Sequence, residues 1–153
     1  MSFRIGILTI LTAGILLTGC SSVMPAAMGS MDMAGAPADL DYAVERLSDR
    51  GLFTVRYASE LDPVSINEVH VWNLHVETAD GQPVDDATIT VGGGMPEHNH
   101  GMPTQPEVTG YLGDGNYRVE GMKFQMPGWW TVTFAIVAAG QEDAVTFNLN
   151  LQQ

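Results

Sequence analysis

The sequence contains a single cysteine, Cys20, among 153 residues. One cysteine cannot form a disulfide within the chain, and it cannot supply the cysteine frameworks of structural zinc sites. Basic residues are also scarce, with 6 Lys and Arg against 18 Asp and Glu and a formal net charge of −12. Because proteins that bind nucleic acid neutralise phosphates with Lys and Arg, this balance argues against a nucleic-acid partner.

Long apolar stretches are missing except near the N-terminus, where residues 5–17 read IGILTILTAGILL after Arg4. This stretch is too short for an ordinary membrane span, but it has the positive start and apolar core of a secretory signal peptide. It ends in LTGC at 17–20, which resembles the bacterial lipobox, in which the cysteine is acylated and becomes the first mature residue. We therefore expect residues 1–19 to be a lipoprotein signal peptide.

Acylation of Cys20 would anchor the mature protein to a membrane without crossing it, because two acyl chains are about the minimum for stable anchoring. The expected location is the cell envelope. By the sorting rule of such lipoproteins, Ser21 favours the outer membrane, facing the periplasm, in a Gram-negative host. Residues 20–39 are mostly small residues with four methionines, which is typical of a flexible tether.

From residue 40 onward, apolar residues recur at every second position, which is the pattern of half-buried β-strands. Turn signals such as SDRG, ADGQP and GDGN separate the runs. The pattern predicts strands over 40–45, 52–57, 68–77, 84–91, 107–112 and 116–124, then a strand marked by Trp130 to Ile136 and, after a link at 138–143, a last strand marked by Val145 to Leu151.

These short strands and the lack of a convincing helix pattern indicate an all-β domain over residues 40–153. We predict an immunoglobulin-like antiparallel β-sandwich of about 7–8 strands. Val119 and Met122 lie at opposite parities in the same strand, so Gly121 is expected to be a β-bulge that resets the register.

Three segments of this domain resemble a known family. GGGMPEHNHGMPTQP (92–106), LGDGNYRVEGMKFQMPGWW (112–130) and NEVHVWNLHVETADGQPV (67–84) are similar to the YtkA-like or FixH-like domain of bacterial periplasmic and lipid-anchored proteins. The resemblance extends over residues 50–151. It implies a part in copper handling, in metal homeostasis or in cytochrome oxidase maturation.

The first of these segments gathers imidazole and thioether side chains, which suit Cu(I), while imidazoles alone suit Cu(II) or zinc. Two of its histidines are two residues apart and would point the same way in an extended segment. The sequence therefore predicts a copper site, Cu(I) or Cu(II). The candidate ligands are His98, His100, Met95, Met102, Met122 and Met126.

A structural interpretation of the same segment stays open. Met95 could plug the end of the sandwich while prolines hold a long loop rigid and the histidines face water. A 15-residue loop without secondary structure is uncommon in a compact domain and is usually functional or disordered. The alternative function is then a non-metal structural or protein-interaction module that contacts an envelope protein through this loop.

Two further residues are candidate contacts, and no enzyme signature is found. His70 shares parity with Trp72, which favours a histidine at the edge of the core, or a third ligand if its strand end meets the loop. Trp129 has the opposite parity to Trp130 and is expected to be exposed. The sequence has no GxSxG motif and no glycine-rich loop opening a helix, so we expect a binding protein and not an enzyme.

Overall fold

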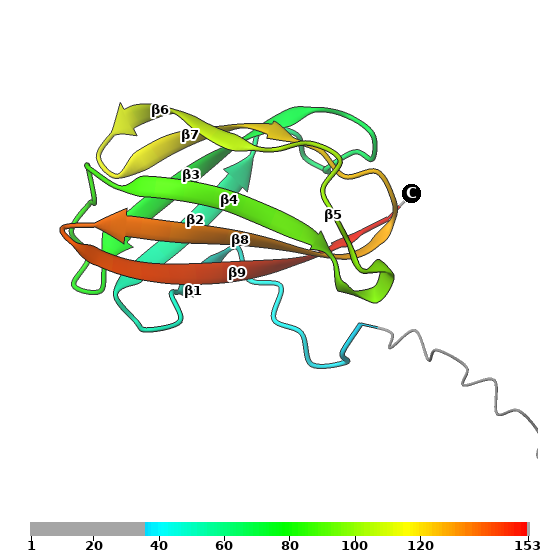
Figure 1. Ribbon diagram of the computed structural model, residues 1–153, viewed down its shortest axis with the longest axis horizontal. Helices are drawn as coiled ribbons and strands as arrows, with labels where there is room; N and C mark the ends of the chain where they lie inside the picture. Colours follow the sequence, from blue (N-terminus) through cyan, green and yellow to red (C-terminus); the bar gives the residue numbers. More distant parts are fainter. Residues whose placement is uncertain (1–35, 153) are drawn as a thin grey trace, which may run out of the picture. The chain divides into compact units, whose positions relative to one another are not determined.

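The computed structural model describes residues 36–152 (Figure 1). This part of the chain is nearly all β, and none of its helices is long and apolar enough to cross a membrane. The expected signal peptide, Cys20 and most of the expected tether lie outside the described residues. The elements are β1 (Glu45–Leu47), β2 (Phe53–Ser59), β3 (His70–Thr78), β4 (Thr88–Met95), the 3-10 helix η1 (Pro96–His98), β5 (His100–Gly101), β6 (Glu107–Gly113), β7 (Asn116–Met122), β8 (Gly128–Ala138) and β9 (Gln141–Leu151).

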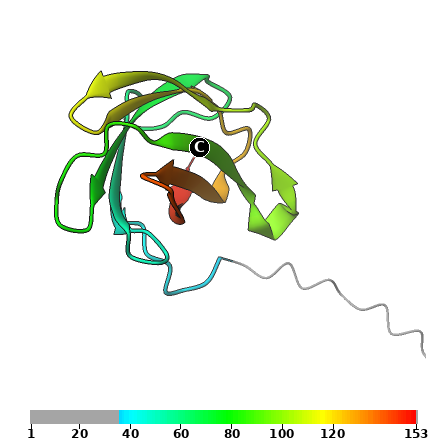
Figure 2. The same cartoon turned by 60° about the vertical axis from the view of Figure 1, so that its left-hand side comes forward.

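All strand pairs are antiparallel, in the order β1-β2-β3-β7-β6-β4-β8-β9, with β5 paired to β4. The sheet is weakest between β4 and β6, where Thr90 opposite Glu107 is the one registered pair. It turns there, so that β4, β8 and β9, with β5 beside β4, face β1, β2, β3, β6 and β7 across the core (Figure 2). The predicted all-β antiparallel sandwich is confirmed.

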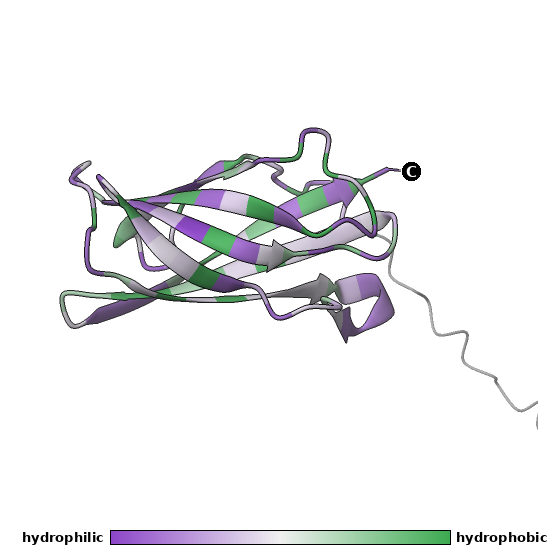
Figure 3. Cartoon of the chain, turned by 90° about the horizontal axis from the view of Figure 1, so that it is seen from above, coloured by the Kyte–Doolittle hydropathy of each residue, from purple (hydrophilic) through white to green (hydrophobic). Residues whose placement is uncertain are grey.

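The core follows the predicted alternation of apolar residues. Trp72, Trp130, Phe134 and Phe147 are fully buried. Hydrophobic and more hydrophilic residues alternate along the strands (Figure 3). Burying one large apolar side chain contributes about 1.5–3 kcal/mol, so these aromatic residues account for a large part of the hydrophobic stabilisation.

The predicted bulge at Gly121 is also confirmed. The β3–β7 register shifts between the pairs Trp72–Val119 and His70–Met122, and Gly121 has a φ of +82°. Glycine adopts this left-handed conformation without steric cost. The shift lets residues of both parities, including Val119 and Met122, face the core.

Several predicted boundaries are wrong, among them the start of the strand predicted over 84–91, which begins at Thr88. Residues 40–44 are not in a strand, β4 runs four residues beyond 91, and the link at 138–143 is only the two-residue turn Ala139–Gly140, with φ values of 48° and 73°. Positive φ at both turn residues matches the twist of a tight hairpin. β8 and β9 therefore pair over their full length.

Candidate functional site

The segment from Met95 to Gly101 is a compact hairpin, which corrects the expectation of a long loop without secondary structure. β4 ends at Met95, η1 makes one turn, and Asn99 takes a left-handed conformation with φ 50°. β5 then folds back onto β4, with His100 opposite Met95 and Gly101 opposite Gly94. We call residues 92–101 the histidine hairpin.

Close backbone contacts explain the glycines at the start of the hairpin. A Cβ on Gly93 would lie 2.5 Å from the carbonyl oxygen of Thr131 in β8, and a Cβ on Gly94 would overlap the carbonyl oxygen of His100. A Cβ on Gly92 would meet nothing within 4 Å. Two of the three glycines are therefore required for β4 to lie against β8 and β5 together.

The hairpin brings His98 and His100 side by side. Their ring centroids are 6.0 Å apart and their planes differ by 23°. The segment is not extended, because His98 lies in η1 and Asn99 is left-handed. The two imidazole rings are therefore close together, as the sequence predicts. A tight turn brings them together, and not the extended backbone that the prediction assumed.

His100 makes more contacts than His98. Its ring lies edge-on to Trp130, with centroids 5.6 Å apart, and its Nδ1 is 2.9 Å from the carbonyl oxygen of Gly101. An Nδ1–H that donates to this carbonyl leaves the lone pair on Nε2. The Nε2 atom is shielded from solvent and has no hydrogen-bond partner within residues 36–152. His98, in contrast, is exposed.

The predicted methionine ligands do not share one environment. Met95 and Met122 are in the core, and Met102 is partly buried against it. Met126 is 38% exposed in the turn before β8, where its carbonyl oxygen accepts a hydrogen bond of 3.0 Å from Nε1 of Trp130. Among the described residues, no three His, Cys, Asp or Glu side chains are grouped so that they could hold a metal.

The two candidate contact residues occupy different surroundings. His70 is only 7% exposed, with its ring 5.7 Å from that of Phe124 and its Nδ1 3.1 Å from the carbonyl oxygen of Glu68. The expectation of an exposed Trp129 is wrong, because this residue is half-buried and its Nε1 donates to Oδ1 of Asn148 at 3.0 Å.

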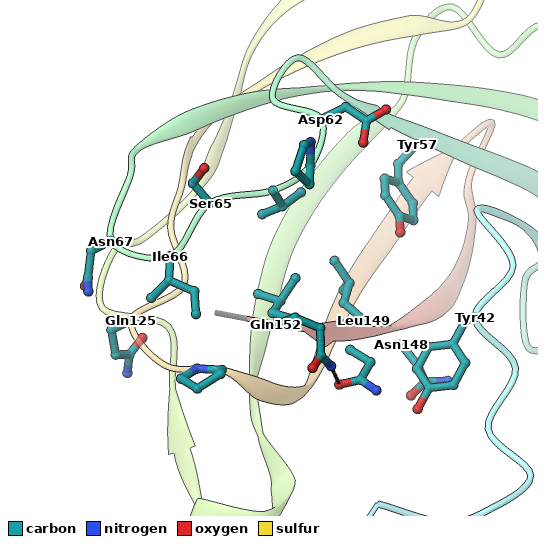
Figure 4. Close-up of a pocket in the computed structure, with 15 residues that line it drawn as sticks. Tyr42, Tyr57, Asp62, Ser65, Ile66, Asn67, Gln125, Asn148, Leu149 and Gln152 are labelled. Carbon is teal, nitrogen blue, oxygen red and sulfur yellow. Dashed lines mark hydrogen bonds between the residues drawn. The ribbon is translucent and has the colours of Figure 1, made fainter.

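Sequence reasoning missed a groove of about 930 Å³ between the 62–67 loop and the end of β9 (Figure 4). Tyr57, Leu149 and Leu151 form its apolar inner wall, and Gln125 lies on its rim. Nε2 of Gln125 is 3.3 Å from Nδ1 of His100, so the groove adjoins the histidine hairpin. Segments far apart in the sequence form it, and no local motif marks it.

A family model described as YtkA-like matches residues 53–135. The chain belongs to the YtkA-like family. This YtkA-like match runs from the start of β2 into β8 and includes the whole histidine hairpin. No curated protein and no solved structure matches the chain.

Proposed function

We propose that this YtkA-like protein is a lipid-anchored protein of the cell envelope that binds copper at His98 and His100 and hands it on, in metal homeostasis or oxidase maturation. It acts as a binding protein and not as an enzyme. The observation that supports the proposal is the pair of imidazoles 6.0 Å apart on a hairpin with a constrained backbone.

The hydrogen bonds of His100 fit a ligand histidine. Metal-ligating histidines usually donate their second ring N–H to a carboxylate or backbone carbonyl, which fixes the ring and raises its basicity. The contact of Nδ1 of His100 with the Gly101 carbonyl has this form when Nδ1 carries the proton, and Nε2 is then the donor atom. His70 has a similar contact to Glu68, but the whole residue is only 7% exposed and its ring packs against Phe124 in the core.

The other groups near the two histidines suit a copper ion that is bound transiently and passed on. Imidazole binds Cu(I) and Cu(II), and a thioether adds affinity for Cu(I). Met126 is the exposed methionine near this end of the domain, tied to the hairpin through Trp130, which contacts both His100 and the Met126 carbonyl. From Cys20 onward the chain has 5 basic and 18 acidic residues, which raises the local concentration of cations.

The test is a titration of residues 36–153 with Cu(I) in the presence of a competing chelator, and with Cu(II) separately. The H98A/H100A double variant should lose at least about tenfold in affinity, because even outer-shell changes at metal sites cost this much. His75→Ala is the matched control, because His75 is not in the histidine hairpin and its ring is hydrogen-bonded to the side chains of Asn116 and Glu77. Equal binding by the double variant and the wild type would rule out the copper site.

A second candidate function is the non-metal interaction module. The burial of Met95 and Met122 favours it, because core methionines stabilise the end of the sandwich without binding an ion. Under this alternative, neither copper ion changes the spectra of the protein, and the double variant affects only contact with an envelope partner.

A further inference from the structure

The order of the strands leaves one part of the sheet edge open. β1 and β9 are the two ends of the order, and β1 has three residues while β9 has eleven. Arg46 reaches the carbonyl oxygen of Thr146, and the Asp49 N–H donates to the carbonyl oxygen of Ala144. Beyond Thr146, β8 is the one strand of the described chain that pairs with β9.

The segment that could cover this edge lies beside it without pairing its backbone with β9. Val44 still accepts a hydrogen bond from the Tyr57 N–H, and Asp41 accepts one from the side chain of Asn148. Residues 40–43 form no strand, and Tyr42 stands at the rim of the groove. The edge of β9 from Asn148 to Leu151, together with Gln152 after it, therefore lines the groove, over about 13 Å at the usual rise per residue.

The groove has an apolar inner wall and a rim of uncharged polar groups. Tyr57, Ile66 and Leu149 point into the same space (Figure 4). Tyr57 is stacked on Trp72, with centroids 4.2 Å apart, so the wall is continuous with the core. Amide side chains predominate at the rim, and Asp62 is the one charged residue among those that line the groove.

These features match an extended peptide better than other ligands. A free strand edge offers backbone N–H and C=O groups, and side-chain pockets beside such an edge accept alternate residues of an added strand. The groove has no cationic side chain for a phosphate or carboxylate. The acidic chain also repels an acidic segment.

We infer that the groove is an acceptor site for one extended segment of a partner protein. The segment pairs its backbone with the end of β9, from Asn148 to Leu151, inserts an apolar side chain against Tyr57 and Leu149, and is neutral or basic. The site is independent of copper. Its rim residue Gln125 contacts His100, so a docked partner lies next to the histidine hairpin.

Nuclear magnetic resonance with ¹⁵N-labelled residues 36–153 tests the inference, because every strand and the whole core lie within this range. The probe is the capped peptide KTVTVTK, without metal. Shift changes are expected at 57–59, 62–67 and 147–152, with slower hydrogen exchange of amides at 148–152. A fully N-methylated peptide of the same sequence should not bind, because it cannot donate backbone hydrogen bonds. The acidic peptide ETVTVTE should bind at least about threefold more weakly.

A matched pair of variants tests the location. Ile66→Trp fills the groove from a loop and should weaken peptide binding at least about tenfold, as expected when a bulky side chain occupies an anchor pocket. Leu112→Trp makes a comparable change on β6, where Leu112 is 56% exposed, and should have no effect. The inference is overturned by equal binding of the N-methylated peptide, by equal binding to Ile66→Trp, or by shifts centred elsewhere. It is also overturned if chitotriose, a neutral oligosaccharide, occupies the groove and the peptide does not.

Discussion

At the scale of single residues, Asp143 is a buried carboxylate at 5% exposure that fastens the turn after β1 to β9. It accepts hydrogen bonds from the Ser48 hydroxyl at 2.6 Å and from the backbone N–H groups of Arg50 and Leu52 at 3.1 and 3.3 Å. Burial by itself raises the pKa of a carboxyl group, but the hydrogen bonds from Ser48 and from backbone N–H groups outweigh it. The pKa of Asp143 is therefore below its ordinary value.

Asp143→Asn should lower the free energy of unfolding at pH 7 by about 1–3 kcal/mol, because buried donors lose a charged acceptor. A carboxyl with a depressed pKa stabilises the fold above its unfolded pKa, and this contribution is lost as the pH falls through the folded pKa. Urea unfolding of both proteins between pH 7 and pH 2.5 should show the difference shrinking below about pH 4. Asp86→Asn serves as the control, because Asp86 is exposed. If the difference in unfolding free energy between wild type and Asp143→Asn did not change with pH, the lowered pKa of Asp143 would be contradicted.

The residues of the histidine hairpin were predictable from the sequence only in part. His98 and His100 were selected by residue type and spacing, which do not depend on the backbone. The burial of Met95 was not predictable by parity, because three glycines precede it and weaken the strand pattern. Its environment becomes clear only when β4 is seen to continue to Met95 and to pair with β5.

At the scale of elements, the histidine hairpin depends on the contact between β4 and β5. Gly94→Ala should destabilise the protein by about 1–3 kcal/mol, because its Cβ would overlap the carbonyl oxygen of His100 and force the strands apart. Gly92→Ala has open space around its Cβ and should change the stability by less than about 0.5 kcal/mol. Chemical denaturation of the two variants measures this difference.

The same pair of variants connects the element to the proposed site. Separation of β5 from β4 should also move His100 away from Trp130, so Gly94→Ala should weaken copper binding while Gly92→Ala keeps it. If both variants have wild-type stability, the close approach of β4 and β5 does not exist in solution.

Strand positions were largely predictable, because alternation of apolar residues depends on burial alone. The errors have local causes. Leu40, Tyr42 and Val44 alternate like a strand, yet residues 40–44 form no strand, and Asp41 meets β9 only through a hydrogen bond from the side chain of Asn148. The turn at Ala139 was missed because alanine rarely adopts the left-handed conformation that it has here.

At the scale of the whole molecule, the groove and the order of the strands could not be derived from local patterns. The groove depends on where β2, the 62–67 loop and β9 meet, and these segments are separated by up to about ninety positions in the chain. Sequence periodicity assigns residues to the core face of a strand but does not say which strands are neighbours. Only the assembled sheet shows that β1 ends before β9 is covered.

Net charge bears on how the protein would be held at a membrane if Cys20 is acylated, as proposed. From Cys20 onward there are 5 basic and 18 acidic residues, and anionic lipid surfaces attract basic segments and repel acidic ones. The protein therefore gains no electrostatic affinity for such a surface. If Cys20 is acylated, its acyl chains supply all of the membrane affinity.

Cys20→Ser should accordingly release the protein completely from the membrane fraction, and low salt should not restore binding. Fractionation of cells that express the full chain, together with metabolic labelling by palmitate, measures both the location and the lipid. Ser22→Ala, two positions away, should remain labelled and membrane-bound. Retention of Cys20→Ser in the membrane fraction would show that another part of the chain, such as an uncleaved apolar stretch at 5–17, holds the protein there.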